Sequence, residues 1–232
     1  MSSPLSSPAS AAAPPFAVWT DFGGVLTQPV DTTFREFSTR YGIPLHALKE
    51  SMRLVGEAHG TDSMGVLDIP LLDEDTWAKE VEAELERTFG LECDLSDFGD
   101  RWFAGRPANR AWAAHLAAFR ASGAFVGLLS NLPPSWERHR AAVADDSRFD
   151  AVVCSHRVGT RKPEPEMFRL AARLAGVEPQ ACVLVDDVEK NTEGAREAGW
   201  HAVLFRDAEQ AAREVGELLR QALDGAAPVP AP

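Results

Sequence analysis

Three groups of polar residues each follow a short apolar run, and their types suit the transfer of an anionic group. Asp21 follows Val18-Trp19-Thr20 and precedes a glycine-rich turn, Ser130-Asn131 follow a second run, and Asp186-Asp187 follow a third. If the runs are strands of one parallel sheet, their ends meet at one edge, where open α/β proteins bind ligands. The carboxylates would repel one another unless a cation lay between them, and Mg²⁺ suits such oxygen ligands.

A single lysine in a proline-rich loop adds a positive charge to this set. The chain has four lysines against nineteen arginines, and Lys162 lies between Arg161 and Pro163-Glu164-Pro165. A compact ammonium among so many guanidinium groups suits a point charge that faces an anion. Taken singly, Lys162 is better explained as a solvated loop residue, and Ser130 alone also indicates no function. Taken together, in this order and spacing, they predict an anion site.

The elements that would position these residues alternate between strand and helix after residue 124. Apolar runs predict strands over 125–129, 149–154, 181–185 and 202–205, and amphipathic spacing predicts helices over 133–144, 165–175, 191–198 and 208–223. Such alternation is typical of an α/β fold, a Rossmann-like parallel sheet with right-handed crossovers. Residues 16–29 and 109–224 are assigned to this core, with a helix over 109–122.

Residues 30–108 contain helical spacing and no strand pattern. Helices are expected over 31–41, 44–57, 75–88 and 95–103, and residues 56–65 are expected to form a loop. This stretch is longer than a βα connection needs, so we expect an inserted small all-helical cap domain over the strand ends. Trp77 and Trp102 are expected in its core rather than against a ligand.

Composition excludes several classes of function. A formal net charge of -12 argues against a nucleic-acid surface, although a few local cations can still define a site for a small phosphorylated substrate. Residues 1–15 and 225–232 are predicted to be disordered tails. Residues 1–15 lack the pattern of a signal peptide or membrane anchor, so a cytoplasmic location and no membrane partner are expected. Cys154 and Cys182 lie in apolar runs and are expected to be buried free thiols.

Four motifs in this order resemble those of the haloacid dehalogenase (HAD) superfamily. They are Asp21-Phe22-Gly23-Gly24-Val25-Leu26-Thr27, Leu129-Ser130-Asn131, Arg161-Lys162-Pro163, and Val185-Asp186-Asp187 followed by Asn191. The similarity extends from about Phe16 to Leu223 and is greatest to the phosphatase-like branch with a helical C1-type cap.

The resemblance implies a role for each motif residue. Asp21 would be the nucleophile that forms an aspartyl-phosphate, Ser130 and Asn131 would hold the phosphoryl oxygens, and Lys162 would steady the nucleophile and the transferred group. The implied cofactor is Mg²⁺, held by Asp21, Asp187 and the backbone carbonyl of Gly23, with Asp186 and Asn191 supporting its water shell. The implied partner is a small phosphorylated metabolite.

One position departs from the family pattern. Phosphatases of this family usually have a second Asp two residues after the nucleophile, as general acid, where this chain has Gly23. General acid catalysis contributes about 10²- to 10⁴-fold in rate. Asp31, Asp186 or a residue of the cap could replace it.

Three functions remain open after this departure. The favoured one is a Mg²⁺-dependent phosphatase with another acid or an easy leaving group. The second is a metal-independent 2-haloacid dehalogenase, whose family pattern also lacks the second Asp, although Asp186-Asp187 is the metal-binding form of the last motif. The third is a non-enzymatic member that binds a phosphorylated ligand or a protein partner.

Overall fold

A five-stranded parallel sheet forms the centre of the protein. In the computed structural model, which describes residues 16–225, the strand order is β3-β2-β1-β4-β5. The strands are β1 (Ala17–Thr20), β2 (Phe125–Ser130), β3 (Ala151–Cys154), β4 (Cys182–Asp186) and β5 (His201–Leu204). Thr20 pairs with Leu128 on one side and with Val185 on the other. The carboxyl ends of β1, β2 and β4, which carry the predicted site residues, are therefore adjacent.

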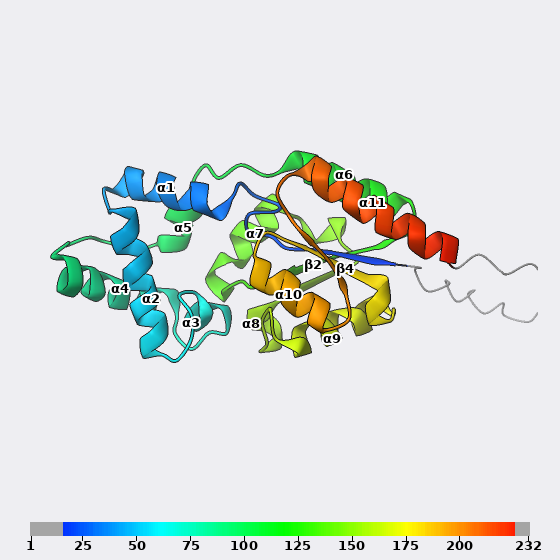
Figure 1. Cartoon of the computed structure of the whole chain (residues 1–232). Helices are drawn as coiled ribbons and strands as arrows, with labels where there is room; N and C mark the ends of the chain where they lie inside the picture. The colour runs from blue at the N-terminus through cyan, green and yellow to red at the C-terminus, as the bar shows by residue number, and fades with distance from the viewer. Residues whose placement is uncertain (1–15, 226–232) are drawn as a thin grey trace, which may run out of the picture.

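Helices cover both faces of this sheet (Figure 1). One layer contains α6 (Arg110–Ala121) and α11 (Ala208–Gly225), and the other contains α9 (Pro165–Ala175) and α10 (Glu189–Glu197). Because side chains alternate along a strand, Val18 packs in the first layer and Trp19 in the second. The predicted α/β class is confirmed. Shorter elements complete the core: η1 (Pro134–Trp136), α7 (Glu137–Val143), η2 (Asp146–Arg148), α8 (Ser155–Val158) and η3 (Pro179–Ala181).

Five helices lie between β1 and α6, and we call them the helical insertion. They are α1 (Val30–Tyr41), α2 (Leu45–Ala58), α3 (Gly65–Asp68), α4 (Glu74–Phe89) and α5 (Phe98–Phe103). The helix predicted over 95–103 begins only at Phe98, since Asp97 has a left-handed φ of 51° that interrupts the helical path. The turn α3 was not predicted, because four residues are too few to show a helical period.

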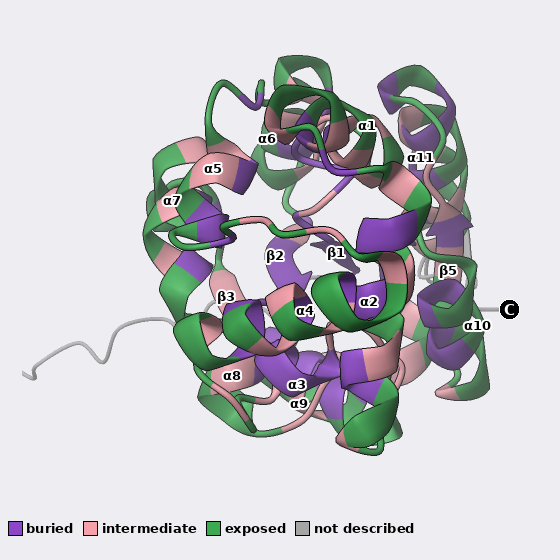
Figure 2. Cartoon of the chain, turned by 90° about the vertical axis from the view of Figure 1, so that its left-hand side faces the viewer, coloured by how far each residue is buried: buried purple, intermediate pink, exposed green. Residues whose placement is uncertain are grey.

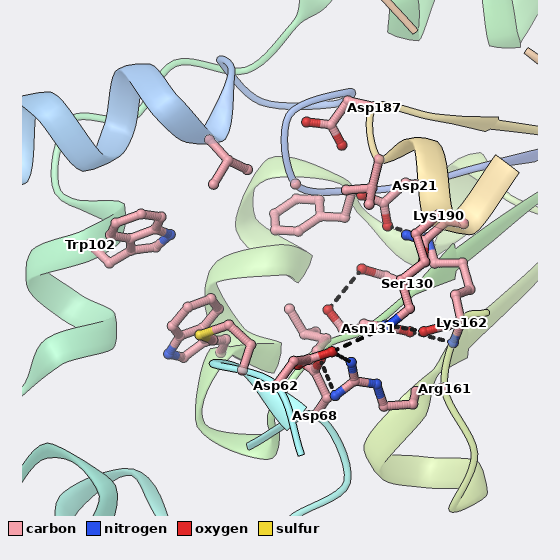
Figure 3. Close-up of a pocket in the computed structure, with 18 of the residues that line it drawn as sticks. Asp21, Asp62, Asp68, Trp102, Ser130, Asn131, Arg161, Lys162, Asp187 and Lys190 are labelled. Atoms are coloured by element: carbon pink, nitrogen blue, oxygen red, sulfur yellow. Dashed lines mark hydrogen bonds and ion pairs between the residues drawn. The ribbon is translucent and has the colours of Figure 1, made fainter. Parts of the chain in front are cut away.

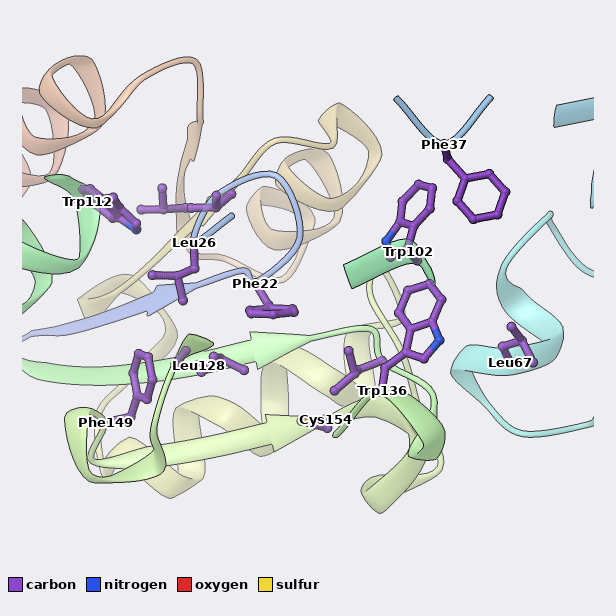
Figure 4. Close-up of a cluster of buried hydrophobic side chains, with 14 of the residues drawn as sticks. Phe22, Leu26, Phe37, Leu67, Trp102, Trp112, Leu128, Trp136, Phe149 and Cys154 are labelled. Carbon is purple, nitrogen blue, oxygen red and sulfur yellow. The ribbon is translucent and has the colours of Figure 1, made fainter. Parts of the chain in front are cut away.

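The insertion and the sheet share one apolar core. Trp102 of α5 stacks on Trp136 of η1, with ring centroids 6.2 Å apart and an interplanar angle of 19°. Phe37 extends this cluster into the insertion, while Phe22 and Leu128 extend it toward the sheet (Figure 4). Phe98 of α5 belongs to the same cluster, with its ring centroid 4.9 Å from that of Phe37. Figure 2, viewed from the side of the insertion, shows α2 and α4 in front of β1 and β2. The insertion therefore packs against the strand ends.

The remaining expectations concern the cysteines and the chain ends. Cys154 and Cys182 are buried free thiols, as predicted, and burial raises the pKa of each to about 12. No helix among residues 16–225 is both long enough and apolar enough to cross a membrane. The predicted tails, 1–15 and 225–232, lie outside the described residues except for Gly225, which ends α11.

Candidate active site

Asp21 and Lys162 form a buried ion pair at the carboxyl edge of the sheet (Figure 3). Asp21 directly follows β1, where its backbone N–H donates to Val185 in β4 at 2.9 Å. The ammonium of Lys162 donates to Oδ1 of Asp21 at 2.7 Å and to Oδ2 of Asp186 at 2.5 Å. Burial raises the pKa of Asp21, and the nearby Lys162 counteracts that rise. The two carboxylates raise the pKa of Lys162, which is therefore a cation.

Asp186 and Asn131 both hydrogen-bond with Lys162 and hold it in place. Asp186 accepts hydrogen bonds from the side chain of Asn191 at 3.1 Å and from the backbone of Val188 at 2.8 Å. Asn131 accepts from the backbone N–H of Lys162 at 2.8 Å and donates to its carbonyl at 2.9 Å. The amide of Asn131, predicted to hold a phosphoryl group, therefore fixes the loop that carries Lys162.

Asp187 has the free oxygen that a metal site needs. Its Oδ1 is buried without a hydrogen-bond partner, and carboxylate oxygens of Asp21, Asp186 and Asp187 lie within 4.8 Å of one another. Burial, followed by the charges of Asp21 and Asp186, raises the pKa of Asp187 to about 7. A buried carboxylate oxygen without a donor, beside two like charges, is stabilised by a hard cation. The donor set fits Mg²⁺.

Glycines in the turn after Asp21 make room for this cluster. Gly24 has a φ of 82°, and a Cβ at this position would lie 2.0 Å from Oδ2 of Asp187. A Cβ on Gly23 would meet only Val30, at 3.9 Å. Gly24 is thus required by the approach of Asp187, whereas Gly23 leaves space for a longer side chain.

A cavity of about 270 Å³ opens beside Asp21, and the predicted site residues surround it. Gly23, Ser130, Asn131, Lys162, Asp187 and Asn191 all line it, and Asp186 lies directly behind Lys162. Part of its wall is aromatic and consists of Phe22, Phe34, Trp102, Phe103 and Trp136. Trp102 was expected only in the core, but it packs there and also borders the cavity.

Arg106 adds a cation to the same wall. It is 9% exposed, and its guanidinium lies 5.5 Å from the rings of Trp102 and Phe103. One Nη donates to the carbonyl of Gln28 at 3.1 Å, whereas the buried Nε has no partner. Burial lowers the pKa of Arg106 to about 10. Among residues 16–225 it makes no ion pair, so it favours an anionic ligand.

The insertion contributes two carboxyl groups. Asp62 and Asp68 border the cavity and both pair with Arg161, the residue before Lys162 (Figure 3). Nη1 of Arg161 lies 3.4 Å from Oδ2 of Asp68. Burial is the main reason that the pKa of Asp68 is raised to about 7, whereas the pKa of the more exposed Asp62 is lowered by Arg161.

The structure distinguishes the candidates for the missing acid. Asp31 is exposed, pairs with Lys49 at 2.6 Å and is not among the cavity residues. Asp186 is fully buried, and both of its carboxylate oxygens already accept hydrogen bonds, from Lys162, Val188 and Asn191. The insertion residues Asp62 and Asp68 remain. Sequence spacing did not single out Asp68, but a signal existed, since it is the only charged residue between Gly65 and Leu72.

Comparisons with known proteins show which proteins this chain resembles. The family model described as haloacid dehalogenase-like hydrolase matches residues 17–199. Fructose-1-phosphate phosphatase YqaB of Escherichia coli is 44% identical over 194 residues, which are 80% of this chain and 94% of that protein. Phosphoserine phosphatase of Thermus thermophilus is 38% identical over 124 residues, or 51% of this chain. This chain spans 50% of the length of the Thermus enzyme and 27% of a bifunctional epoxide hydrolase of Rattus norvegicus.

Solved structures share the fold at low sequence identity. A HAD family enzyme of Bacteroides thetaiotaomicron, solved with magnesium and inorganic phosphate, has a TM-score of 0.60 at 20% identity, covering 83% of this chain and 94% of that one. L-2-haloacid dehalogenase of Xanthobacter autotrophicus has a TM-score of 0.58 at 21% identity, covering 89% and 87%. The fold is therefore shared by a HAD family enzyme solved with magnesium and inorganic phosphate and by an L-2-haloacid dehalogenase.

Proposed function

The chain belongs to the haloacid dehalogenase-like hydrolases, and we propose that within this family it is a Mg²⁺-dependent phosphatase of a small phosphorylated metabolite. The observation that carries the proposal is the orphaned oxygen of Asp187 beside the Asp21–Lys162 pair. A metal-independent reaction gives no reason to bury a third carboxylate without a donor at this place. The names of the two phosphatase relatives support the same class of substrate.

Asp21 is the proposed nucleophile. One of its oxygens would attack phosphorus, the bond from phosphorus to the substrate oxygen would break, and an aspartyl-phosphate would form. Lys162 would orient Asp21 and keep it ionised despite burial, because its ammonium lies 2.7 Å from the carboxylate. Water would then release inorganic phosphate and regenerate Asp21.

Neutralisation of charge is the second requirement, since a carboxylate must approach an anionic phosphoryl group. Ser130, Lys162 and Arg106 line the cavity and would supply one hydroxyl and two cations. Asp21, Asp187 and the carbonyl of Gly23 would hold Mg²⁺, which when bound offsets negative charge on the phosphoryl oxygens. The loop interactions of Asn131 and Asp186 would keep Lys162 in position.

We propose that the cavity limits the size of the substrate. We further propose that the helical insertion acts as the cap and selects the substrate. A cavity volume of about 270 Å³ lies slightly below the common range of ligand cavities, about 300–1,000 Å³, which favours a small ester. The aromatic wall would pack against the carbon skeleton of the substrate.

The test is phosphate release from sugar, nucleotide and small-metabolite monoesters and from an activated aryl phosphate, with Mg²⁺ or with chelator. We expect release that requires the metal and that falls by at least about 10³-fold in Asp21→Asn, as when a covalent nucleophile is removed. Circular dichroism should show an unchanged fold. Chloride release from 2-haloacids without phosphate release would support a dehalogenase instead, and full activity in Asp21→Asn would contradict the mechanism.

A further inference from the structure

The proposed phosphatase reaction lacks a proton donor for the departing oxygen, because Gly23 occupies the usual position of the acid. We propose that Asp68, at the end of α3, is the general acid and base of this site. This assignment rests on the proposed function, and it moves the acid from the loop after β1 to the helical insertion.

The backbone of Asp68 is fixed at the boundary between the insertion and the sheet. Its carbonyl accepts a hydrogen bond from the hydroxyl of Ser155, directly after β3, at 2.6 Å, and its N–H donates to Met64 at 3.0 Å. Asp68 is 5% exposed and borders the same cavity as Asp21, Ser130 and Lys162. The carboxyl group is thus held on the insertion side of the cavity that the leaving group must occupy.

The surroundings of Asp68 suit a group that gives up a proton near neutral pH. Its pKa is raised to about 7: burial is the largest cause and the charges of Asp62 and Asp21 add to it, while the charges of Arg161 and Lys162 oppose the rise. Among the described residues, its side chain makes no hydrogen bond, and its only ion pair is the 3.4 Å contact with Arg161. A general acid works best when its pKa is near the working pH.

Arg161 would stabilise the Asp68 carboxylate that remains after the proton has left. Its two Nη atoms reach Asp68 and Asp62, so one guanidinium bridges both acids. A Cβ on Gly65 would lie 2.3 Å from Nη1 of Arg161, and glycine there permits the approach. Because Arg161 precedes Lys162 in the chain, the loop that orients the nucleophile also holds the acid.

The proton balance runs through both half-reactions. As Asp21 attacks phosphorus and the bond to the substrate oxygen breaks, the proton of Asp68 passes to that oxygen, and a neutral alcohol leaves. The Asp68 carboxylate then accepts a proton from the water that attacks the aspartyl-phosphate. Inorganic phosphate departs, Asp21 is again a carboxylate, and Asp68 again carries its proton.

The test compares two esters in Asp68→Asn: an activated aryl phosphate, whose leaving group needs no proton, and a simple alkyl phosphate, whose leaving group does. We expect kcat/KM for the alkyl ester to fall by about 10²- to 10⁴-fold and for the aryl ester by less than about 5-fold. The limb of the alkyl pH–rate profile that falls as pH rises should be lost. Asp68→Glu, which keeps the acid, should restore much of the alkyl activity.

The matched control is Asp62→Asn, which removes the other partner of Arg161 but leaves the buried acid in place. It should affect both esters to the same extent. Equal losses on both esters in Asp68→Asn, with an unchanged pH profile, would overturn the assignment and leave Asp68 as a positioning residue for Arg161. Since the two esters are compared within one sample, partial unfolding cannot imitate selectivity. Wild-type protein inert toward the aryl ester would instead overturn the proposed function itself.

Discussion

The ammonium of Lys162 lies 2.7 Å from the carboxylate of Asp21, and both side chains are buried. Lys162 is also 2.5 Å from Asp186, so a single cation joins the ends of β1 and β4 to the loop before α9. A buried charge is tolerated when it is paired and hydrogen-bonded, and here each member satisfies the others. Catalytic geometry and stability therefore depend on the same three groups.

Lys162→Met should unfold more easily than the wild type by about 3–5 kcal/mol, because it leaves two buried carboxylates without their cation. The loss should be smaller near pH 5 than near pH 8, since those carboxylates can take up protons at lower pH. Urea unfolding measures both effects. The control is Lys49→Met, which breaks the exposed pair with Asp31 and should cost at most about 1 kcal/mol. Equal stability of the two variants would contradict this account.

The contributions of Asp68 and Asp187 to the stability of the metal-free protein should fall as pH rises from about 4 to about 7. Asp68 and Asp187 have folded-state pKa values of about 7 against ordinary values of 3.8, so the folded state binds more protons in this window. Each carboxyl then reduces stability by roughly 1.4 kcal/mol per pH unit. Mg²⁺ stabilises ionised Asp187 and should counteract the fall, most strongly above pH 7. Unfolding midpoints with Mg²⁺ and with chelator test this, and an identical pH profile under both conditions would refute it.

Gly24→Ala should weaken Mg²⁺ binding, because the new Cβ would displace Asp187, whose Oδ2 lies 2.0 Å from its position. We expect about 10- to 100-fold more Mg²⁺ for half-maximal stabilisation, as when groups that orient metal ligands are changed. Gly123→Ala is the matched control: its φ of 94° imposes similar backbone strain, but its Cβ would meet no atom within 4 Å. If both variants needed the same Mg²⁺ concentration for half-maximal stabilisation, backbone strain alone would explain the weaker binding, and contact with Asp187 would have no part in it.

The sheet and the residues at its strand ends were predictable because local patterns encode them. Apolar runs that end in Asp21, Ser130 and Asp186 specify parallel strands, and parallel strands bring their carboxyl ends together. The position of Lys162 in this group followed from the order of the motifs. The fold class was therefore obtained from short-range information and from the resemblance.

The contacts between the insertion and the core were not predictable in this way. Asp68 reaches Arg161 across 93 positions of the chain, and no period or spacing relates the two. Asn131 was expected to hold phosphoryl oxygens. Only the folded structure shows that both polar atoms of its side-chain amide hydrogen-bond to the backbone of Lys162. The Asp68–Arg161 pair depends on how the insertion packs on the sheet, and the Asn131–Lys162 pair on how the loop before α9 packs beside the end of β2. Local propensity determines neither.

Gly23→Asp should do little in the wild-type background and should partly rescue Asp68→Asn. The backbone at Gly23 has no left-handed φ, and a Cβ there would meet only Val30 at 3.9 Å, so an aspartate fits beside the cavity. If Asp68 already donates the proton, a second acid changes alkyl phosphate turnover by less than about 3-fold, whereas without Asp68 it should restore about 10-fold or more of the lost rate. Gly23→Asn is the control, because it has the same size but no proton to donate. Steady-state kcat/KM for the alkyl ester should be measured for the wild type, Gly23→Asp, Asp68→Asn and the double variant. A large gain from Gly23→Asp alone, with no rescue of Asp68→Asn beyond that gain, would mean that the site works without an acid and that Asp68 has another role.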